Sequence, residues 1–279
     1  MITPGEISPG SCLFTRIFQQ SHLTSNARAY CFCARNGGIL KIVIISDIHG
    51  NLAALNALPE RDFDQLWCIG DLVDYGPNPH EVVEWVRQQA KVTVRGNHDH
   101  AAGFSVDPQC STPFKKLAED TLRFTQVVCT QDDFGFLRSL PIRQELTVNS
   151  ARFYLVHAIP SDPLFGYCPE GSDQWKQEVE RINSNFLIVG HTHTPFVRRE
   201  GNTIILNPGS LGQPKTGRPL ACYAVWQDGH VSLKEFEYPV ADTIRGIRAM
   251  PISSEEQDAL IGLLRTGTLP AMQSSKATR

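Results

Sequence analysis

Hydrophobic residues occur in short runs that alternate with helical patterns, and many of the runs end in polar clusters. The β-branched run at 42–45 predicts a buried strand, and 79–90 predicts an amphipathic helix with proline in its first turn. Further strands are predicted at 66–69, 91–94, 146–148, 153–156, 186–189, 196–198, 203–206, 222–226 and 231–237. Further helices are predicted at 51–58, 113–138 with a break near 130, 172–184, 240–249 and 253–265. This alternation predicts an α/β domain.

Three regions differ in their patterning. Residues 1–39 are basic, nearly free of acids and without a sustained period, and they lack the apolar run of a secretory signal. They are interpreted as a leader, either disordered or a non-native extension before an alternative start at Leu40, although a transit peptide stays open. Residues 40–240 are predicted to form one domain, followed by a helical tail at 241–279. Within the domain, 101–145 is interpreted as an insertion that packs on the sheet and partly lines the cleft; a cap or a dimer contact are the alternatives.

Composition excludes several classes of protein. The chain has 279 residues, 41% of them hydrophobic, with 26 basic and 29 acidic side chains and a net charge of −3. This is ordinary globular composition, and we expect no stable nucleic-acid complex. No apolar run approaches the roughly 18 residues that span a membrane, so no membrane partner is expected. The eight cysteines form no CxxC pair, which favours thiols in a reducing compartment and a cytoplasmic location.

Polar clusters follow five of the predicted strands. They are DIHG at 47–50, GDLVD at 70–74, GNHD at 96–99, a histidine at 157 and GHTH at 190–193. In an open α/β sheet, the carboxyl ends of the strands gather side chains into one crevice. Ligands that are far apart in the sequence are therefore expected to converge.

The residue types in these clusters suit a pair of metal ions. Asp47 and His49 are two apart, so in an extended segment they point the same way and can hold one ion. The Asp71 carboxylate can bridge two cations, and Asn97 offers a neutral oxygen. Imidazole nitrogens come from His157, His191 and His193. A mixed set without thiolate suits Mn, Fe or Zn better than Mg or Ca alone, and two cations about 3.5–4 Å apart can clamp a phosphate.

Each cluster alone has a simpler interpretation. Asp71 and Asp74 could be turn or cap residues, Asn97 could belong to a loop, and His157 could be a core histidine. Five such clusters in order, each closing a strand, instead indicate a metal centre.

The order of these motifs resembles the calcineurin-like metallophosphoesterase superfamily, whose pattern is DxH, GDxxD, GNH(D/E), H and GHxH. The NPGS run at 207–210 is similar to that of the compact bacterial and archaeal phosphodiesterase branch. The resemblance covers about residues 40–265. It implies a four-layer αββα sandwich of two mixed β-sheets with helices outside, an α/β (α+β) fold.

The resemblance also implies roles for individual residues. Asp71 would bridge two divalent ions, the first held by Asp47, His49 and His193 and the second by Asn97, His157 and His191. His98 would lie beside the phosphate, where it stabilises the transition state or protonates the leaving oxygen, and Asp74 would orient it. Asp99 is expected to close its turn by hydrogen bonding, and His100 is expected to face solvent.

The function implied is a dimetal phosphoesterase that hydrolyses phosphodiester bonds by in-line attack of a metal-bridging hydroxide. Tyr75, in GDLVDYG, stands where protein phosphatases and diadenosine tetraphosphatases carry a phosphate-gripping arginine, which favours the diesterase branch. The alternatives are a phosphomonoesterase or nucleotide pyrophosphohydrolase, and a catalytically silent binding scaffold. Such scaffolds typically lose metal residues that are all present here.

We expect manganese at the centre, with Fe, Zn, Ni or Mg as alternatives. The expected partner is a small phosphoester or nucleotide substrate, and a homodimer is left open. Arg95, Lys215 and Arg218 are interpreted as solvated charges rather than phosphate contacts.

Overall fold

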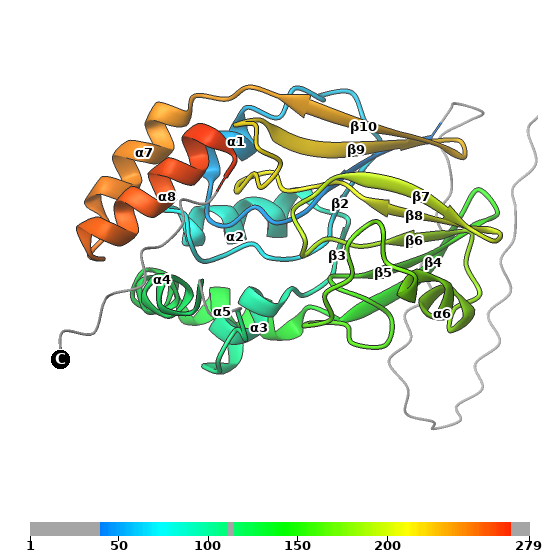
Figure 1. The fold of residues 1–279 in the computed structure, drawn as a ribbon, viewed down its shortest axis with the longest axis horizontal. Helices are drawn as coiled ribbons and strands as arrows, with labels where there is room; N and C mark the ends of the chain where they lie inside the picture. The colour runs from blue at the N-terminus through cyan, green and yellow to red at the C-terminus, as the bar shows by residue number, and fades with distance from the viewer. Residues whose placement is uncertain (1–39, 111–113, 269–279) are drawn as a thin grey trace, which may run out of the picture. The chain divides into compact units, whose positions relative to one another are not determined.

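The computed structural model describes residues 40–110 and 114–268, which form two mixed β-sheets with helices around them (Figure 1). The predicted leader at 1–39 and the end of the predicted tail lie outside the described residues. The helices and strands otherwise follow the sequence prediction closely, with ends that differ by a few residues.

The first sheet has the strand order β10-β9-β1-β2-β3. Its strands are β1 (Lys41–Ile45), β2 (Gln65–Cys68), β3 (Val92–Thr93), β9 (Ala221–Gln227) and β10 (His230–Phe236). β1, β2 and β3 are parallel, whereas β9 is antiparallel to both β1 and β10. In this register Ile44 pairs with Trp67 on one side and with Ala224 on the other.

The second sheet has the order β4-β5-β6-β8-β7. Its strands are β4 (Arg143–Val148), β5 (Ala151–Val156), β6 (Phe186–Ile188), β7 (Phe196–Glu200) and β8 (Thr203–Asn207). β5, β6 and β8 are parallel, and the outer strands β4 and β7 are antiparallel to their neighbours. Each sheet therefore contains three neighbouring parallel strands whose carboxyl ends point the same way.

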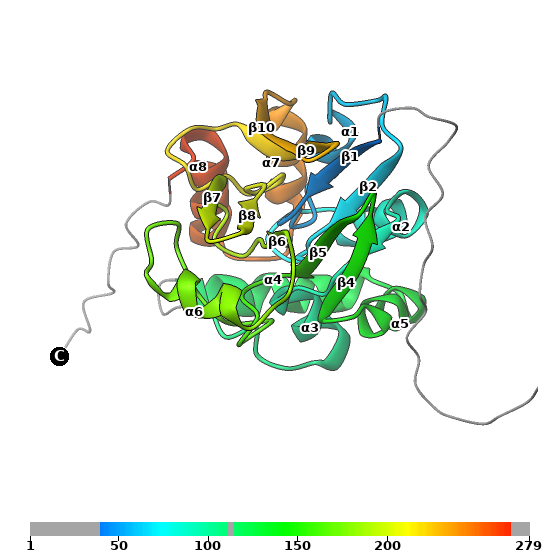
Figure 2. The ribbon, with the colours of Figure 1, turned by 90° about the vertical axis from the view of Figure 1, so that its right-hand side faces the viewer.

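Helices cover the outer face of each sheet. α1 (Leu52–Asn56) and α2 (Pro79–Gln89) pack on the first sheet through the side chains of Val43 and Ile45, and α6 (Gln174–Glu180) packs on the second through Trp175. The space between the sheets is filled by Ile42, Ile44, Trp67, Phe153, Phe186, Leu206 and Trp226. β1 is thus buried on both faces, which explains its uninterrupted apolar run. The four-layer sandwich is confirmed (Figure 2).

The segment predicted as an insertion, 101–145, contains the end of α3 (Asn97–Phe104) together with α4 (Lys115–Val128) and α5 (Gln131–Ser139). α3 is absent from the predicted helices, because GNHD was analysed only as a polar cluster that follows a strand. The helix forms there because the Asp99 carboxylate accepts a hydrogen bond from the Gly96 N–H at 3.0 Å, which caps its first turn.

The two last helices, α7 (Val240–Ala249) and α8 (Ser254–Thr266), pack within the chain. Leu260 and Leu264 of α8 join a cluster with Ile247 of α7 and Leu117 of α4. The described part of the predicted tail therefore packs against the same chain. Among the described residues, no helix has the length and apolarity needed to cross a membrane.

Candidate metal centre

The polar clusters occupy loops at the carboxyl ends of strands from both sheets. Asp47 and His49 follow β1, Asp71 follows β2, and His157 follows β5. The loops are tied to one another through the backbone, since Ile48 N–H donates to Asp71 O at 2.8 Å and Gly190 N–H donates to His157 O at 2.8 Å. The convergence that the sequence predicts is therefore built by loop-to-loop hydrogen bonds.

The backbone of these loops is strained. Six of the singled-out residues have left-handed φ values between 48° and 65°, namely Asp47, His49, Asp71, Asp74, His191 and His193. Each such conformation costs a non-glycine residue about 1 kcal/mol. Glycine permits close approach between the loops: a Cβ on Gly96 would lie 2.0 Å from Asp71 Oδ1.

Asp47, His49 and His193 form the first cluster of ligand atoms, which lie within 4.8 Å of one another (the Asp47 group). His49 Nε2 lies 3.2 Å from His193 Nε2, which in turn lies 3.3 Å from Asp47 Oδ1. The Nδ1 atoms of the two histidines hydrogen-bond to the carbonyls of Val73 and Gln213, at 2.9 and 2.8 Å. With the proton on Nδ1, each Nε2 is free to bind a metal.

Asp71, His157 and His191 form the second cluster (the Asp71 group). His157 Nε2 lies 3.2 Å from Asp71 Oδ2, and its Nδ1 hydrogen-bonds to Ile69 O at 2.6 Å. Asp71 Oδ2 also lies 3.7 Å from His49 Nε2 of the Asp47 group. One carboxylate oxygen therefore faces both clusters.

Asn97, the first residue of α3, lies beside the Asp71 group. Its Nδ2 donates to Pro108 O at 2.8 Å, which fixes the amide so that Oδ1 is buried without a partner among the described residues. Both carboxylate oxygens of Asp47 are likewise buried and unpartnered. Buried oxygens in this state cost free energy unless something binds them. The donor set fits a pair of divalent cations.

The protonation of these groups is shaped by burial. Burial raises the pKa of Asp47 to about 6 and lowers the pKa of His191 to about 3. It also places the pKa of His49 and of His193 well below the usual range. These imidazoles are consequently neutral at pH 7, which is the form that binds metal.

His98 lies beside the two clusters, and a hydrogen bond to Asp74 holds its ring in place. Its Nδ1 hydrogen-bonds to Asp74 Oδ2 at 2.8 Å, and Thr125 Oγ1 of α4 donates to Asp74 Oδ1 at 2.7 Å. Although burial alone would lower it, the pKa of His98 is raised well above its usual range by the Asp71 charge and the hydrogen bond to Asp74. Asp74 is thus placed to orient a protonated His98. Thr125 could not be identified from the sequence, because α4 carries no motif.

Asp99 and His100 follow on α3. Asp99 Oδ2 accepts from Asp71 N–H at 2.8 Å and Oδ1 accepts from Leu72 N–H at 2.8 Å, so its predicted hydrogen-bonding role in the turn is confirmed. His100 does not face solvent freely. Its ring lies 4.8 Å from that of Phe104, and its Nδ1 is buried.

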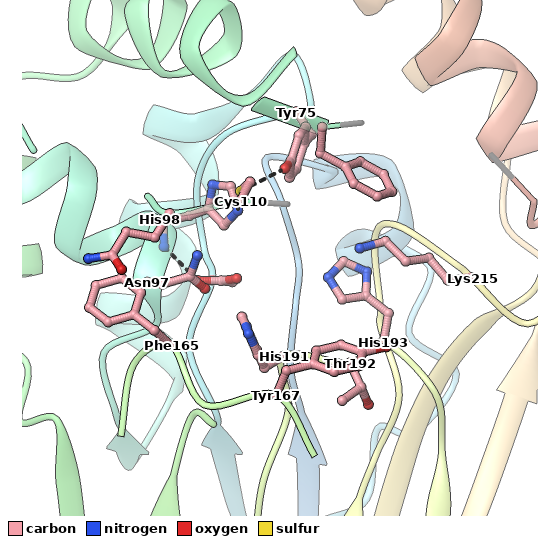
Figure 3. A pocket seen from close by; sticks show the side chains of 13 residues that line it. Tyr75, Asn97, His98, Cys110, Phe165, Tyr167, His191, Thr192, His193 and Lys215 are labelled. Atoms are coloured by element: carbon pink, nitrogen blue, oxygen red, sulfur yellow. Dashed lines mark hydrogen bonds between the residues drawn. The ribbon is translucent and has the colours of Figure 1, made fainter. Parts of the chain in front are cut away.

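A cavity of about 490 Å³ opens over the clusters (Figure 3). Its wall includes Asp71, Asn97, His98, His191 and His193 together with side chains that the sequence did not predict. The latter include Cys110 and Phe114, so the insertion partly lines the cleft, as expected. Cys110 Sγ lies 3.5 Å from His98 Nε2 and from the Tyr75 hydroxyl.

Lys215 also lines this cavity, contrary to the interpretation as a solvated charge. The loop that follows the NPGS run carries it into the site, and no spacing rule in the sequence reveals this. The two other candidate cations lie outside the cavity wall. Arg95 donates to Arg138 O, and Arg218 pairs with Glu235.

Two clusters of histidine and carboxylate sharing one pocket define a metal-dependent phosphoesterase type of site. A family model of the calcineurin-like phosphoesterase superfamily domain matches residues 40–228, and the chain belongs to this superfamily. It is a metal-dependent phosphoric ester hydrolase.

Known proteins agree with this assignment. The chain is 33% identical over 223 residues to MJ0912 of Methanocaldococcus jannaschii, covering 71% of this chain and 88% of that protein. It is 26% identical over 199 residues to the phosphodiesterase YfcE of Escherichia coli, covering 65% and 84%. The crystal structure of a metallophosphoesterase from Sphaerobacter thermophilus superposes with a TM-score of 0.72 at 29% identity, covering 83% of this chain and all of that one.

Proposed function

We propose that this chain hydrolyses phosphodiester bonds at a centre of two divalent cations, with manganese as the preferred metal. Asp47, His49 and His193 would hold one ion, Asn97, His157 and His191 the other, and Asp71 would bridge them. The observation that carries the proposal is the position of Asp71 Oδ2, 3.2 Å from His157 Nε2 and 3.7 Å from His49 Nε2.

When bound, the cations would supply Lewis acidity to the phosphoryl group and lower the pKa of the attacking water. The side chains of Asp74 and His98 supply the proton transfer. Asp74 accepts from His98 Nδ1, which leaves the Nε2 proton directed into the pocket. His98 Nε2 gives that proton to the leaving oxygen as its bond to phosphorus breaks. His98 is then neutral until it takes up a proton from solvent.

A diester is favoured by the position of Tyr75. Its ring lies 4.9 Å from that of His49 and 4.8 Å from that of His98, and it is buried. An arginine there would add a positive charge for a doubly charged phosphomonoester, whereas tyrosine adds none. The printed name of the relative YfcE, a phosphodiesterase, supports the same choice.

The remaining expectations are kept as part of the proposal. All five cysteines among the described residues are free, which supports a reducing compartment such as the cytoplasm. A small phosphoester or nucleotide fits a cavity of about 490 Å³. A homodimer stays an open alternative.

The test is hydrolysis of bis-p-nitrophenyl phosphate by metal-stripped protein with Mn²⁺ added back. We expect activity that requires metal and that falls by about a hundredfold or more in Asp71→Asn and His98→Ala. The rate on mono-p-nitrophenyl phosphate separates a diesterase from a monoesterase. Metal binding without turnover on diester, monoester or pyrophosphate would refute the proposal and favour the binding scaffold.

A further inference from the structure

Lys215 is a cation in the wall of the metal cavity. Within residues 40–110 and 114–268 its Nζ makes no ion pair and no hydrogen bond. It lies over the ring of Phe114, whose centroid is 5.1 Å away, and the carboxylates of Asp47 and Asp71 act on it only through longer-range attraction. The side chain is half-buried, and this burial lowers the pKa of Lys215. Partly desolvating an ammonium group without a hydrogen-bond acceptor is unfavourable unless a ligand supplies one.

The position of Lys215 sets it apart from the machinery for the scissile phosphate. Figure 3 shows it beside His193, across the cavity from Asn97 and His98. It is therefore not placed to assist His98 at the leaving oxygen. Two divalent cations would more than neutralise Asp47 and Asp71, so Lys215 is not needed as their counter-charge either.

Aromatic side chains form another part of the cavity wall. Phe114, Phe165 and Tyr167 line it, and Tyr167 is 66% exposed at the mouth, with its ring centroid 6.1 Å from that of His191. Exposed aromatic faces beside a phosphate site suit the stacking of a flat base. A lysine on the same wall suits a further phosphate carried by the same molecule.

We propose that Lys215 determines specificity by binding a second phosphoryl group, so that the preferred substrate is a nucleotide phosphodiester that carries another phosphate besides the scissile one. This inference rests on the proposed function. A charge-assisted hydrogen bond from the ammonium group to that phosphate is expected to change affinity about ten- to a hundredfold.

The experiment uses two dinucleotides that differ by one phosphate, ApA and its 5′-phosphorylated form pApA. Each is added to full-length, Mn²⁺-loaded protein as a competitor of bis-p-nitrophenyl phosphate hydrolysis, and the inhibition constants are compared. Binding of both to His98→Ala protein is measured in parallel by calorimetry. The wild type is expected to bind pApA about ten- to a hundredfold more tightly than ApA.

Three variants test whether Lys215 causes that preference. Lys215→Met is expected to reduce it to about threefold or less, and Lys215→Arg is expected to retain most of it because the charge remains. Lys176→Met removes an exposed lysine of α6 that does not line the cavity, and it should keep the wild-type ratio. Metal content and thermal unfolding report whether each variant is folded.

The outcomes separate the two proposals. A wild type that does not distinguish pApA from ApA overturns the inference, whatever the variants do. So does a Lys215→Met protein that keeps the ratio but loses metal or stability, because Lys215 would then be a structural counter-charge. In both cases hydrolysis of bis-p-nitrophenyl phosphate would leave the proposed function standing. Absence of turnover on every phosphoester refutes the proposed function instead.

Discussion

The hydrogen bond from Thr125 to Asp74 links α4 of the insertion to His98, and Thr125→Val removes it with almost no change in side-chain volume. Thr125 is fully buried, and its Oγ1 lies 2.7 Å from Asp74 Oδ1. Valine leaves that carboxylate oxygen unpaired. A hydrogen bond to a charged group contributes about 1.5–3 kcal/mol, so the free energy of unfolding should fall by this amount. In a domain of this size that lowers Tm by roughly 3–12 °C.

The same change is expected to alter catalysis. Burial raises the pKa of Asp74, and the hydrogen bonds from His98 and Thr125 oppose this rise. Without Thr125 the pKa of Asp74 increases further, the carboxylate is protonated at a higher pH, and it then no longer accepts from His98. We expect kcat on bis-p-nitrophenyl phosphate to fall about three- to tenfold, with the acid limb of the pH profile moved to higher pH.

Thr121→Val is the matched control. Thr121 lies one turn earlier in α4, is equally buried, and donates to Leu117 O at 2.8 Å rather than to the site. It should lower stability slightly and leave both kcat and the pH profile unchanged. The reasoning would be refuted if Thr125→Val lowered Tm but kept the wild-type pH profile, or if the two valine variants behaved alike.

Three further changes test other parts of the structure. Gly96→Ala should reduce bound metal below the two ions per chain that we propose for the wild type, because its Cβ would lie 2.0 Å from Asp71 Oδ1; metal content equal to that of the wild type would contradict this. Chelation should lower Tm because it leaves both oxygens of Asp47 unpartnered, and the loss should grow as pH rises from about 4 to about 6 and level off above that, because the pKa of Asp47 is raised from 3.8 to about 6 in the folded protein. Asp47→Asn should remove that pH dependence in the chelated protein. His80→Gln should lower the free energy of unfolding by at most about 0.5 kcal/mol below pH 6.5 and should not change it in alkali. The reason is that the hydrogen bond to the Asp133 carboxylate in α5 raises the pKa of His80, so the protonated imidazole is the form that stabilises the fold. Urea unfolding at both pH values measures this.

The sequence was most informative where chemistry and periodicity coincide. The run at 42–45 marked β1 because both of its faces are buried, and each polar cluster marked the end of a strand. Candidate ligands could be proposed from the sequence because a metal site needs particular residue types at nearly fixed spacing. The fold itself was predicted mainly from the resemblance to the calcineurin-like metallophosphoesterase superfamily, since periodicity alone does not reveal that two sheets stack.

Other features of the site were invisible because they depend on tertiary contacts. α3 forms through one side-chain cap by Asp99, and Thr125 acts through a single hydroxyl in an otherwise ordinary helix. Lys215 is brought to the cavity by the path of a loop. Neither Thr125 nor Lys215 has a neighbour in the sequence that would distinguish it from a surface threonine or lysine.

The distribution of the ligands over both sheets has a consequence for how the protein is made. His49 and His193 are 144 positions apart, yet their Nε2 atoms lie 3.2 Å from each other. A chain still emerging from the ribosome carries the DxH and GDxxD motifs long before the GHTH motif exists. Chains that end before residue 193 therefore lack the complete set of ligands and cannot assemble the metal centre.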